Sequence, residues 1–216
     1  MSVVIVNGSS NSGVGGTVTC SLPAAVSPGN LLLAYAFSQT GVTPPAGWTR
    51  FIQQNSGSFL TLECYRRIAD GTEGSTITFT GAVTSWIVAM NKLTGTRFDA
   101  TCIVNPQSNG TSVDDDTITA PDPGTAAAGQ VRIASGAAIN GSNNGNGGSW
   151  NALAALAVGV DPNSSLMVNR WKGAGGPGAP FIQFGTSNDF NDLVSASFIV
   201  KDVPALPGSA LLLCEV

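Results

Sequence analysis

The chain has 216 residues with a formal net charge of −4, no histidine and only 10% charged residues, against about 25% in typical soluble domains. The lack of histidine excludes His-based catalytic triads and His zinc sites, and the scattered lysines and arginines exclude a nucleic-acid-binding surface. A surface this poor in charge favours a protein covered by neighbours in an assembly over one that diffuses freely.

Neither a membrane span nor a secretory signal is expected from the sequence. The longest apolar runs fall well short of the ~18–20 residues that cross a bilayer, and Met1–Val4 includes no basic side chain. Each cysteine lies in or beside an apolar segment, at Cys20, Cys64, Cys102 and Cys214. We therefore expect four reduced, buried thiols, with disulfides as the alternative.

The N-terminal segment is the first candidate for binding a partner. It consists of Ser2, Val3, Val4, Ile5 and Val6, a short run that is almost wholly apolar. An extended apolar segment of this kind is able to add a strand to the sheet of an adjacent subunit. The sequence therefore predicts an arm that contacts another protein.

Alternation of apolar and polar residues predicts strands in the first half of the chain. In Leu60–Cys64 the two leucines and the cysteine share an inner face, while Thr61 and Glu63 point away from it. Thr76–Thr80 alternates in the same way. Trp86–Met90 is apolar on both faces, so this strand is either central, with something packed on each side, or part of a subunit contact.

The second half of the chain repeats the order of features in the first. Thr17–Cys20 is followed by Pro28–Ala34 and, one hundred positions further on, Thr117–Ala120 is followed by Ala128–Ala134. Later blocks match in the same order, with Leu62–Arg66 and Val168–Lys172, Ile77–Phe79 and Ile182–Phe184, and Trp86–Lys92 and Val194–Lys201. This repeat predicts two related sets of strands, about 17–95 and 117–202, that share one core within a single domain of residues 1–216.

Short side chains dominate two segments of the second half. Gly136–Ser149 and Gly173–Pro180 are rich in glycine, so we expect loops that are mobile or ordered only by a neighbour. Asn151–Val158, between them, is predicted to be a strand or a helical turn. Trp150 and Trp171 flank these loops and are able to stack on a sugar ring or dock in a neighbouring subunit, the other interpretation being a place in the core.

The expected fold class follows from these short strands, which are separated by Gly, Pro, Asn and Ser turns without any long helical period. About twelve strands at this spacing predict an all-β protein, a two-sheet antiparallel sandwich of the jelly-roll or Greek-key type built from two pseudo-repeated halves. A closed β-barrel is the lesser alternative.

No group of residues in the sequence predicts catalysis. Asp114–Asp116 is the strongest acidic cluster, but it lacks the spaced acidic loop of a calcium site, so a solvated strand entry is preferred over calcium binding. No serine lies in a G-x-S-x-G elbow, and the acids fall in no recognisable glycosidase pattern. We therefore expect no enzyme, no cofactor and no metal site.

Three motifs carry a resemblance to known proteins. Pro28–Ala34 reads P-G-N-L-L-L-A, Pro44–Thr49 reads P-P-A-G-W-T, and Tyr65–Glu73 reads Y-R-R-I-A-D-G-T-E. In this order they resemble motifs of a recurring set of phage-encoded virion proteins, over roughly Val18–Leu93, with Asn30 in place of the usual aspartate. The resemblance implies a β-sandwich at the particle surface, a head decoration protein or a tail or fibre element, with architectural motif residues and a Gly-Trp turn that seats tryptophan over one end of the sandwich.

Resemblance and composition together lead to one functional prediction. We expect a bacteriophage virion structural protein, a capsid decoration or surface protein that is made in the host bacterial cytoplasm and binds neighbouring virion subunits. It should form a homo-oligomer, such as a trimer, and contact capsid or tail subunits rather than nucleic acid or membrane. The alternative is a tail-fibre or receptor-binding module that recognises a host-surface glycan, and a carbohydrate-active enzyme is a distant third.

Overall fold

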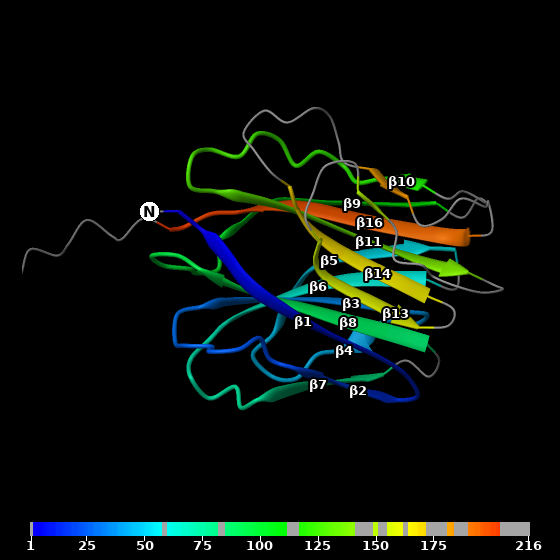
Figure 1. Ribbon diagram of the computed structural model, residues 1–216, viewed down its shortest axis with the longest axis horizontal. Helices are drawn as coiled ribbons and strands as arrows, with labels where there is room; N and C mark the ends of the chain where they lie inside the picture. The colour runs from blue at the N-terminus through cyan, green and yellow to red at the C-terminus, as the bar shows by residue number, and fades with distance from the viewer. Residues whose placement is uncertain are drawn as a thin grey trace, which may run out of the picture.

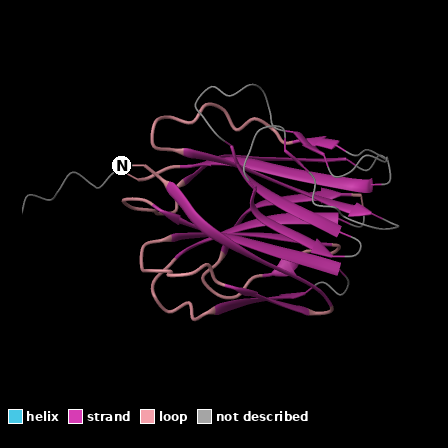
Figure 2. Cartoon of the chain, viewed as in Figure 1, coloured by secondary structure: helices cyan, strands magenta, loops and turns pink. Residues whose placement is uncertain are grey.

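In the computed structural model the chain is built from antiparallel β-sheets joined by loops, with no helix among the described residues (Figure 2). The structure describes residues 2–57, 60–81, 85–111, 117–140, 149–150, 155–161, 164–171, 181–183 and 190–203. Between residues 139 and 191 it describes the backbone of the strands alone. The all-β fold predicted from the alternating sequence pattern is confirmed.

The first half of the chain forms a five-stranded and a three-stranded sheet. Its strands are β1 (Val4–Val14), β2 (Thr17–Ser21), β3 (Leu31–Ser38), β4 (Val42–Thr43), β5 (Thr49–Ser56), β6 (Leu60–Ile68), β7 (Thr76–Gly81) and β8 (Ser85–Thr94). Sheet A has the order β1-β8-β3-β6-β5, and sheet B has the order β2-β7-β4. This is the strand order of a jelly roll in which β5 has joined the edge of the larger sheet.

The second half repeats this arrangement strand by strand. Its strands are β9 (Ile103–Thr111), β10 (Thr117–Thr119), β11 (Val131–Asn140), β12 (Ser149–Trp150), β13 (Ala155–Asp161), β14 (Ser164–Trp171), β15 (Phe181–Gln183) and β16 (Phe190–Val200). Sheet C has the order β9-β16-β11-β14-β13, and sheet D has the order β10-β15-β12. Each strand takes the place of the strand eight numbers before it, which confirms the predicted repeat.

The turns that lead into β3 and β11 repeat in detail. The Asn30 backbone N–H donates to the Ser27 carbonyl at 3.1 Å, and its side-chain oxygen accepts from the Ser27 N–H at 2.9 Å. Gln130 makes the same two bonds with Ala127, at 3.1 and 3.0 Å. The glycine before each of these residues has a positive φ, 87° and 84°, which most side chains disfavour. Two related sequences therefore build one turn twice.

In β6 and β14 the structure shifts the alignment of the two halves by two residues from the one that the sequence pattern predicts. In the ladders, Ala34 pairs with Tyr65 and Ala134 pairs with Asn169. Tyr65 therefore corresponds to Asn169 rather than to Trp171, with which the sequence pattern matched it. A shift of two residues leaves the same positions on the inner face, so the pattern of residue classes does not detect it.

The two five-stranded sheets pack face to face and share one core. Leu33 and Tyr35 of sheet A lie in a single buried cluster with Ile133 and Phe198 of sheet C. The rings of Tyr35 and Phe198 stack with centroids 6.3 Å apart, and Phe51 meets Phe198 edge-on at 4.9 Å. Sheets B and D cover the outer faces, so the layers follow the order B, A, C, D (Figure 1). The predicted sandwich thus has four sheets, because each half brings its own pair.

The contacts between the halves follow a pseudo-twofold relation. The edge strand β1 of sheet A contacts β13 at the edge of sheet C, and β5 contacts β9 at the opposite edges. Under the correspondence of the repeat, β1 maps to β9 and β13 maps to β5, so the two contacts are equivalent. The large sheets therefore face each other as matching surfaces.

Trp86–Met90 lies in a central strand, as its apolar faces predicted. It belongs to β8, which pairs with β1 on one side and β3 on the other. Ile87 and Ala89 enter the core shared by sheets A and C, whereas Val88 and Met90 enter a second core between sheets A and B. Both faces of sheet A are therefore buried at β8.

One expectation about strands is wrong. Gly136–Asn140, predicted to belong to a loop, is the end of β11 and pairs with β16, because the small residues Gly136–Ala138 fit a strand buried on both sides. Thr61 and Glu63 lie opposite the inner face of Leu60–Cys64, as expected, and both are buried, at 6% and 1% exposure. For Asn151–Val158 the strand alternative is right from residue 155, where β13 begins. Residues 141–148 and the predicted loop 173–180 lie outside the described residues.

Candidate functional site

The three motifs that resemble virion proteins meet at one corner of sheet A. The turn before β3 joins the end of β6, because the Gly29 N–H donates to the Ala69 carbonyl and the Ala69 N–H donates to the Asn30 carbonyl, both at 2.8 Å. The Pro-Pro-Ala-Gly turn joins the same strand, because Arg67 Nη1 donates to the Ala46 carbonyl at 3.1 Å. Segments far apart in the sequence are thus bonded to one another here.

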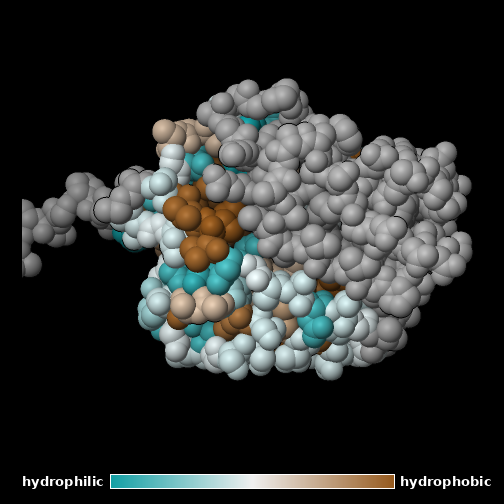
Figure 3. All heavy atoms as spheres, in the orientation of Figure 1, coloured by the Kyte–Doolittle hydropathy of each residue, from teal (hydrophilic) through white to brown (hydrophobic). Residues whose placement is uncertain are grey.

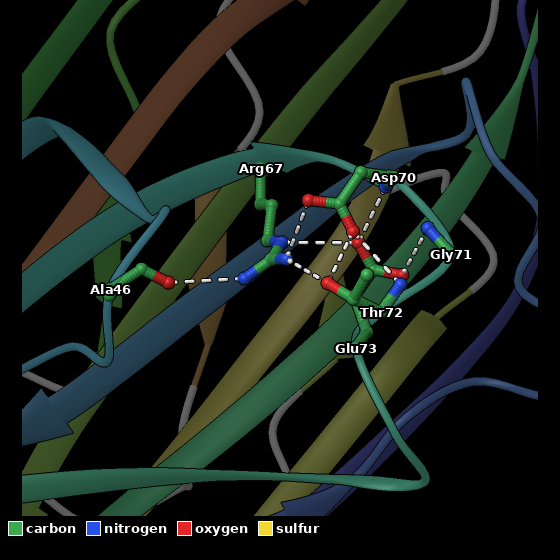
Figure 4. A network of polar contacts seen from close by, with 6 residues as sticks. All are labelled: Ala46, Arg67, Asp70, Gly71, Thr72 and Glu73. Carbon is green, nitrogen blue, oxygen red and sulfur yellow. Dashed lines mark hydrogen bonds and ion pairs between the residues drawn. The ribbon is translucent and has the colours of Figure 1, made fainter.

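Arg67 is the centre of this corner (Figure 4). Its Nε lies 3.1 Å from Glu73 Oε1, and its Nη2 lies 3.2 Å from Asp70 Oδ2. The Glu73 carboxylate also accepts the N–H groups of Asp70 and Gly71, at 2.7 and 3.0 Å. Gly47 has a φ of 87°, a left-handed conformation that most side chains disfavour, so this turn favours glycine. The network fastens one turn to another.

Trp48, which follows this turn, is a core residue. It is 8% exposed, and its ring lies 6.0 Å from that of Phe79 in the core between sheets A and B. The tryptophan after the Gly-Trp turn therefore packs between sheets A and B.

A polar pocket lies where sheet B fails to cover sheet A. Sheet B has three strands over the five of sheet A, and its edge strand β4 has only two residues. A pocket of about 440 Å³ lies there, lined by Thr40–Thr43, Arg50, Gln53, Glu63 and Gly81. This volume is within the range of small-molecule sites, about 300–1,000 Å³, but the pocket is wide open to solvent. We call it the β5 pocket.

An ion pair between a buried carboxylate and a half-exposed guanidinium forms the floor of the β5 pocket. Glu63 Oε1 lies 2.5 Å from Arg50 Nη1, and Glu63 Oε2 accepts the Val42 N–H at 2.7 Å. The Glu63 side chain is 2% exposed and that of Arg50 is 48% exposed. The hydrogen bond to Glu63 raises the pKa of the Arg50 guanidinium above its usual value. The pair thus holds a half-exposed guanidinium in a fixed position at the wall of the pocket.

Gln53 adds an amide group to the polar wall of the pocket. It lies directly opposite Glu63 in the β5–β6 ladder and is exposed, as are Thr40 and Thr43. Both oxygens of Glu63 are engaged, and no second carboxylate lines the described pocket, whereas glycoside hydrolysis uses two. The pocket thus offers hydrogen-bonding groups from Arg50, Gln53, Thr40 and Thr43.

Sequence reasoning did not single out Arg50, Gln53 or Glu63 as a site. Glu63 is the charged residue of the alternating segment Leu60–Cys64, and its place on the polar side of that segment gives no sign that it is buried. Buried charges of this kind are paired, and the preceding strand supplies an arginine. Only the β5–β6 register, with a bulge between Arg50 and Ile52, shows that the arginine reaches it.

The N-terminal segment is part of the fold rather than a free arm. From Val4 onward it forms β1, paired with β8 of its own chain. Val3 is 5% exposed, its N–H donates to the Gly129 carbonyl at 2.8 Å, and Ile5 packs against the shared core. Ser2, before the strand, is exposed. The segment expected to add a strand to the sheet of an adjacent subunit therefore adds one to sheet A of its own chain.

Two valines of this segment nevertheless face outward. Val4 and Val6 are 47% and 49% exposed. Figure 3 shows hydrophobic residues gathered over the start of β1 on this face. We call Val4 and Val6 the valine patch. It is the part of the predicted partner-binding segment that remains available to another molecule.

The two tryptophans predicted as site residues belong to strands of the second half. Trp150 lies in β12 of sheet D opposite Ile182, and Trp171 ends β14 of sheet C opposite Arg132. The backbone therefore places them in different sheets, and their side chains lie outside what the structure describes. Asp114–Asp116 lies outside the described residues too.

The described thiols are free and buried. Burial raises the pKa of Cys64 to about 12 and also raises those of Cys20 and Cys102, while Cys214 lies outside the described residues. Among the residues that the structure describes, no three acidic, cysteine or histidine side chains gather into a metal site. The same residues include no helix long and apolar enough to cross a membrane.

Comparison with known proteins does not assign the chain to a family. A scan against protein-family models and searches of curated proteins and solved structures found no match. The functional argument therefore depends on the motifs of the sequence and on the geometry described above.

Proposed function

We propose that this protein is a structural component of a bacteriophage particle, a capsid decoration or surface protein that binds neighbouring subunits. The observation that carries the proposal is the corner around Arg67. The motifs by which the chain resembles virion surface proteins bond to one another there, through Arg67, Ala46, Asn30 and Ala69. Residues engaged in this way stabilise a shape, which is the task of a surface protein in an assembly.

The valine patch is the surface through which such a protein contacts its neighbour. Val4 and Val6 lie on β1, the edge strand of sheet A, and edge strands with exposed apolar side chains favour association. The partner is another subunit of the particle, a second copy of this chain or a capsid or tail protein. Standard interfaces bury about 800 Å² on each partner, so the patch forms only the apolar centre of a larger contact.

Electron microscopy of purified particles tests this proposal. Density for the four-layered sandwich is expected on the outer surface of the head or tail, and mass spectrometry of the same particles should detect the chain. Purified particles that contain no copy of the chain would refute the virion role.

A pair of variants tests the contact surface. Val4→Asp combined with Val6→Asp should abolish binding of the purified protein to particles that lack it, with an unchanged melting temperature. Gln107→Asp is the matched control, because it adds a carboxylate at an exposed position on β9, the counterpart of β1. Full binding by the double variant would show that the contact lies elsewhere.

A further inference from the structure

We infer that the β5 pocket is a binding site for a neutral sugar unit. The inference goes beyond the structural role proposed above and does not depend on it. It is carried by the polar groups of the pocket, by the cancellation of charge at its floor, and by the absence of equivalent residues at the corresponding strand positions of the second half.

The fold itself does not require these polar residues. The repeat builds the same strands, with a bulge at the same place, from residues that carry neither charge nor amide. By the registers of the two halves the counterparts of Arg50, Gln53 and Glu63 are Ala155, Val158 and Met167. A buried carboxylate is costly unless paired, so a strand that needs only to pack has no reason to hold one. The ion pair is therefore a property of this pocket.

The charges of the pocket favour a neutral ligand. Arg50 and Glu63 carry opposite charges 2.5 Å apart. An anion that approached the guanidinium would also meet the carboxylate, and a cation that approached the carboxylate would also meet the guanidinium. The described lining contains no further charged side chain that would change this balance.

The polar groups match hydroxyl groups. A hydroxyl both donates and accepts, and the pocket offers both kinds of partner. The half-exposed Arg50 supplies N–H donors, the amide of Gln53 supplies a donor and an acceptor, and Thr40 and Thr43 supply hydroxyls. Because Glu63 already fixes the guanidinium, a ligand does not bear the full cost of ordering it. Sugars present several hydroxyls at once on a rigid ring, so they fit this set of groups.

The expected affinity of one pocket is low. No aromatic side chain lines the described pocket, so the stacking that strengthens many sugar sites is missing. We expect a dissociation constant on the order of 1–10 mM for a monosaccharide. Many copies on one particle would raise the overall avidity for a repeating glycan. The pocket also gives glycan binding a place different from Trp150 and Trp171, where the sequence had suggested it.

Titration of the full-length protein by NMR tests the inference. The probes are glucose, galactose and N-acetylglucosamine. Glucuronate is added as an anionic ligand for comparison, and the peptide Gly-Asn-Gly as a protein-like one. At least one neutral sugar should cause saturable shifts of the backbone amides of Gly41, Val42 and Gln53. Gln53→Ala should weaken that binding about tenfold, by loss of hydrogen bonds to the ligand, with an unchanged melting temperature. Gln107→Ala, at an exposed position on β9, should bind as the wild type does.

Four outcomes would overturn the inference. The first is that no neutral sugar shifts these amides at concentrations up to about 50 mM, well above the expected dissociation constant. The second is that glucuronate binds more tightly than glucose, which would contradict the charge argument. The third is that the peptide binds while the sugars do not, and the fourth is that Gln53→Ala binds sugar as well as the wild type does. Each readout uses the isolated protein, so it is independent of whether the chain belongs to a particle.

Discussion

The guanidinium of Arg67 lies 3.1 Å from the carboxylate of Glu73, and this contact fastens the end of β6 to the turn that follows it. The Arg67 side chain is 14% exposed and the Glu73 side chain is 2% exposed, so water screens the pair little. Glu73 also accepts two backbone N–H groups of the turn. The contact therefore stabilises both a strand end and a loop.

Replacement of Glu73 should be strongly destabilising. Glu73→Ala leaves Arg67 and the two N–H groups without their acceptor, and loss of one partner of a buried pair costs about 3–5 kcal/mol. Urea denaturation measures the change in the free energy of unfolding. Asp70→Asn is the control, because Asp70 is 60% exposed and water screens its pair with Arg67, so this variant should change the free energy of unfolding much less. An equal loss in both variants would contradict the assignment of Glu73 as the main partner.

The shared core predicts that the two halves unfold together. Phe198 of the second half contacts Tyr35 and Phe51 of the first. Phe198→Ala should therefore destabilise the whole molecule, by about 3–5 kcal/mol for a buried phenylalanine. Hydrogen exchange of the β3 amides reports on the first half and should accelerate as much as exchange in β11. If β3 keeps its wild-type protection while β11 loses it, the single-domain prediction for residues 1–216 is wrong.

Buried thiols predict a loss of stability at alkaline pH. Cys64 has its pKa raised to about 12 by burial, whereas an unfolded thiol ionises near pH ~8.5. Between these values the unfolded chain releases a proton that the folded chain retains, so the free energy of unfolding falls as pH rises, by about 1.4 kcal/mol per pH unit for one thiol. The raised pKa values of Tyr35 and Tyr65 act in the same direction at higher pH.

Urea midpoints at neutral and alkaline pH measure this effect. The midpoint should fall between pH 7 and pH 10.5, and the fall should be smaller in Cys64→Ala, which removes one of the titrating groups. A midpoint that stays constant over this interval would contradict the burial of the thiols. Titration of the denatured protein without reductant should also find four free thiols.

Association through the valine patch should depend little on salt. Val4 and Val6 are uncharged, and apolar contacts are not screened by ions. The affinity of the purified protein for particles, measured by sedimentation, should change less than about threefold when salt rises from ~50 to ~500 mM, a range that weakens charge-driven binding severely. A loss of affinity of tenfold or more would place charged groups at the contact.

Much of the fold could be predicted because strands carry a period of two. Ile77 and Phe79 face the core between sheets A and B as their alternation predicted, and Trp86–Met90 is central as its two apolar faces predicted. The same period explains why the predicted alignment of the two halves was wrong in β14, since a shift of two residues preserves every inward position. Alternation thus assigns a residue to a face but does not fix the register.

The candidate site could not be predicted in the same way. Alternation correctly placed Glu63 on the other face of the strand from Leu62. Whether that face meets solvent depends on the position of sheet B, a layer formed by residues distant in sequence. Arg50 reaches Glu63 through a bulge that no local pattern specifies. The N-terminal valines show the same limit, because an apolar run reads alike whether it pairs with its own sheet or with another subunit's.

The matching contacts of β1 with β13 and of β5 with β9 have a further consequence for how the molecule would be seen in an assembly. Its two halves meet as the subunits of an isologous dimer do, so a half-turn brings the large sheet of one half nearly onto that of the other. In a map that shows the sheets without their side chains, these two sheets would fit in two opposite orientations about equally well. Side chains that differ between the halves help to decide the orientation, and the large charged pair of Arg50 and Glu63 against Ala155 and Met167 is one such contrast.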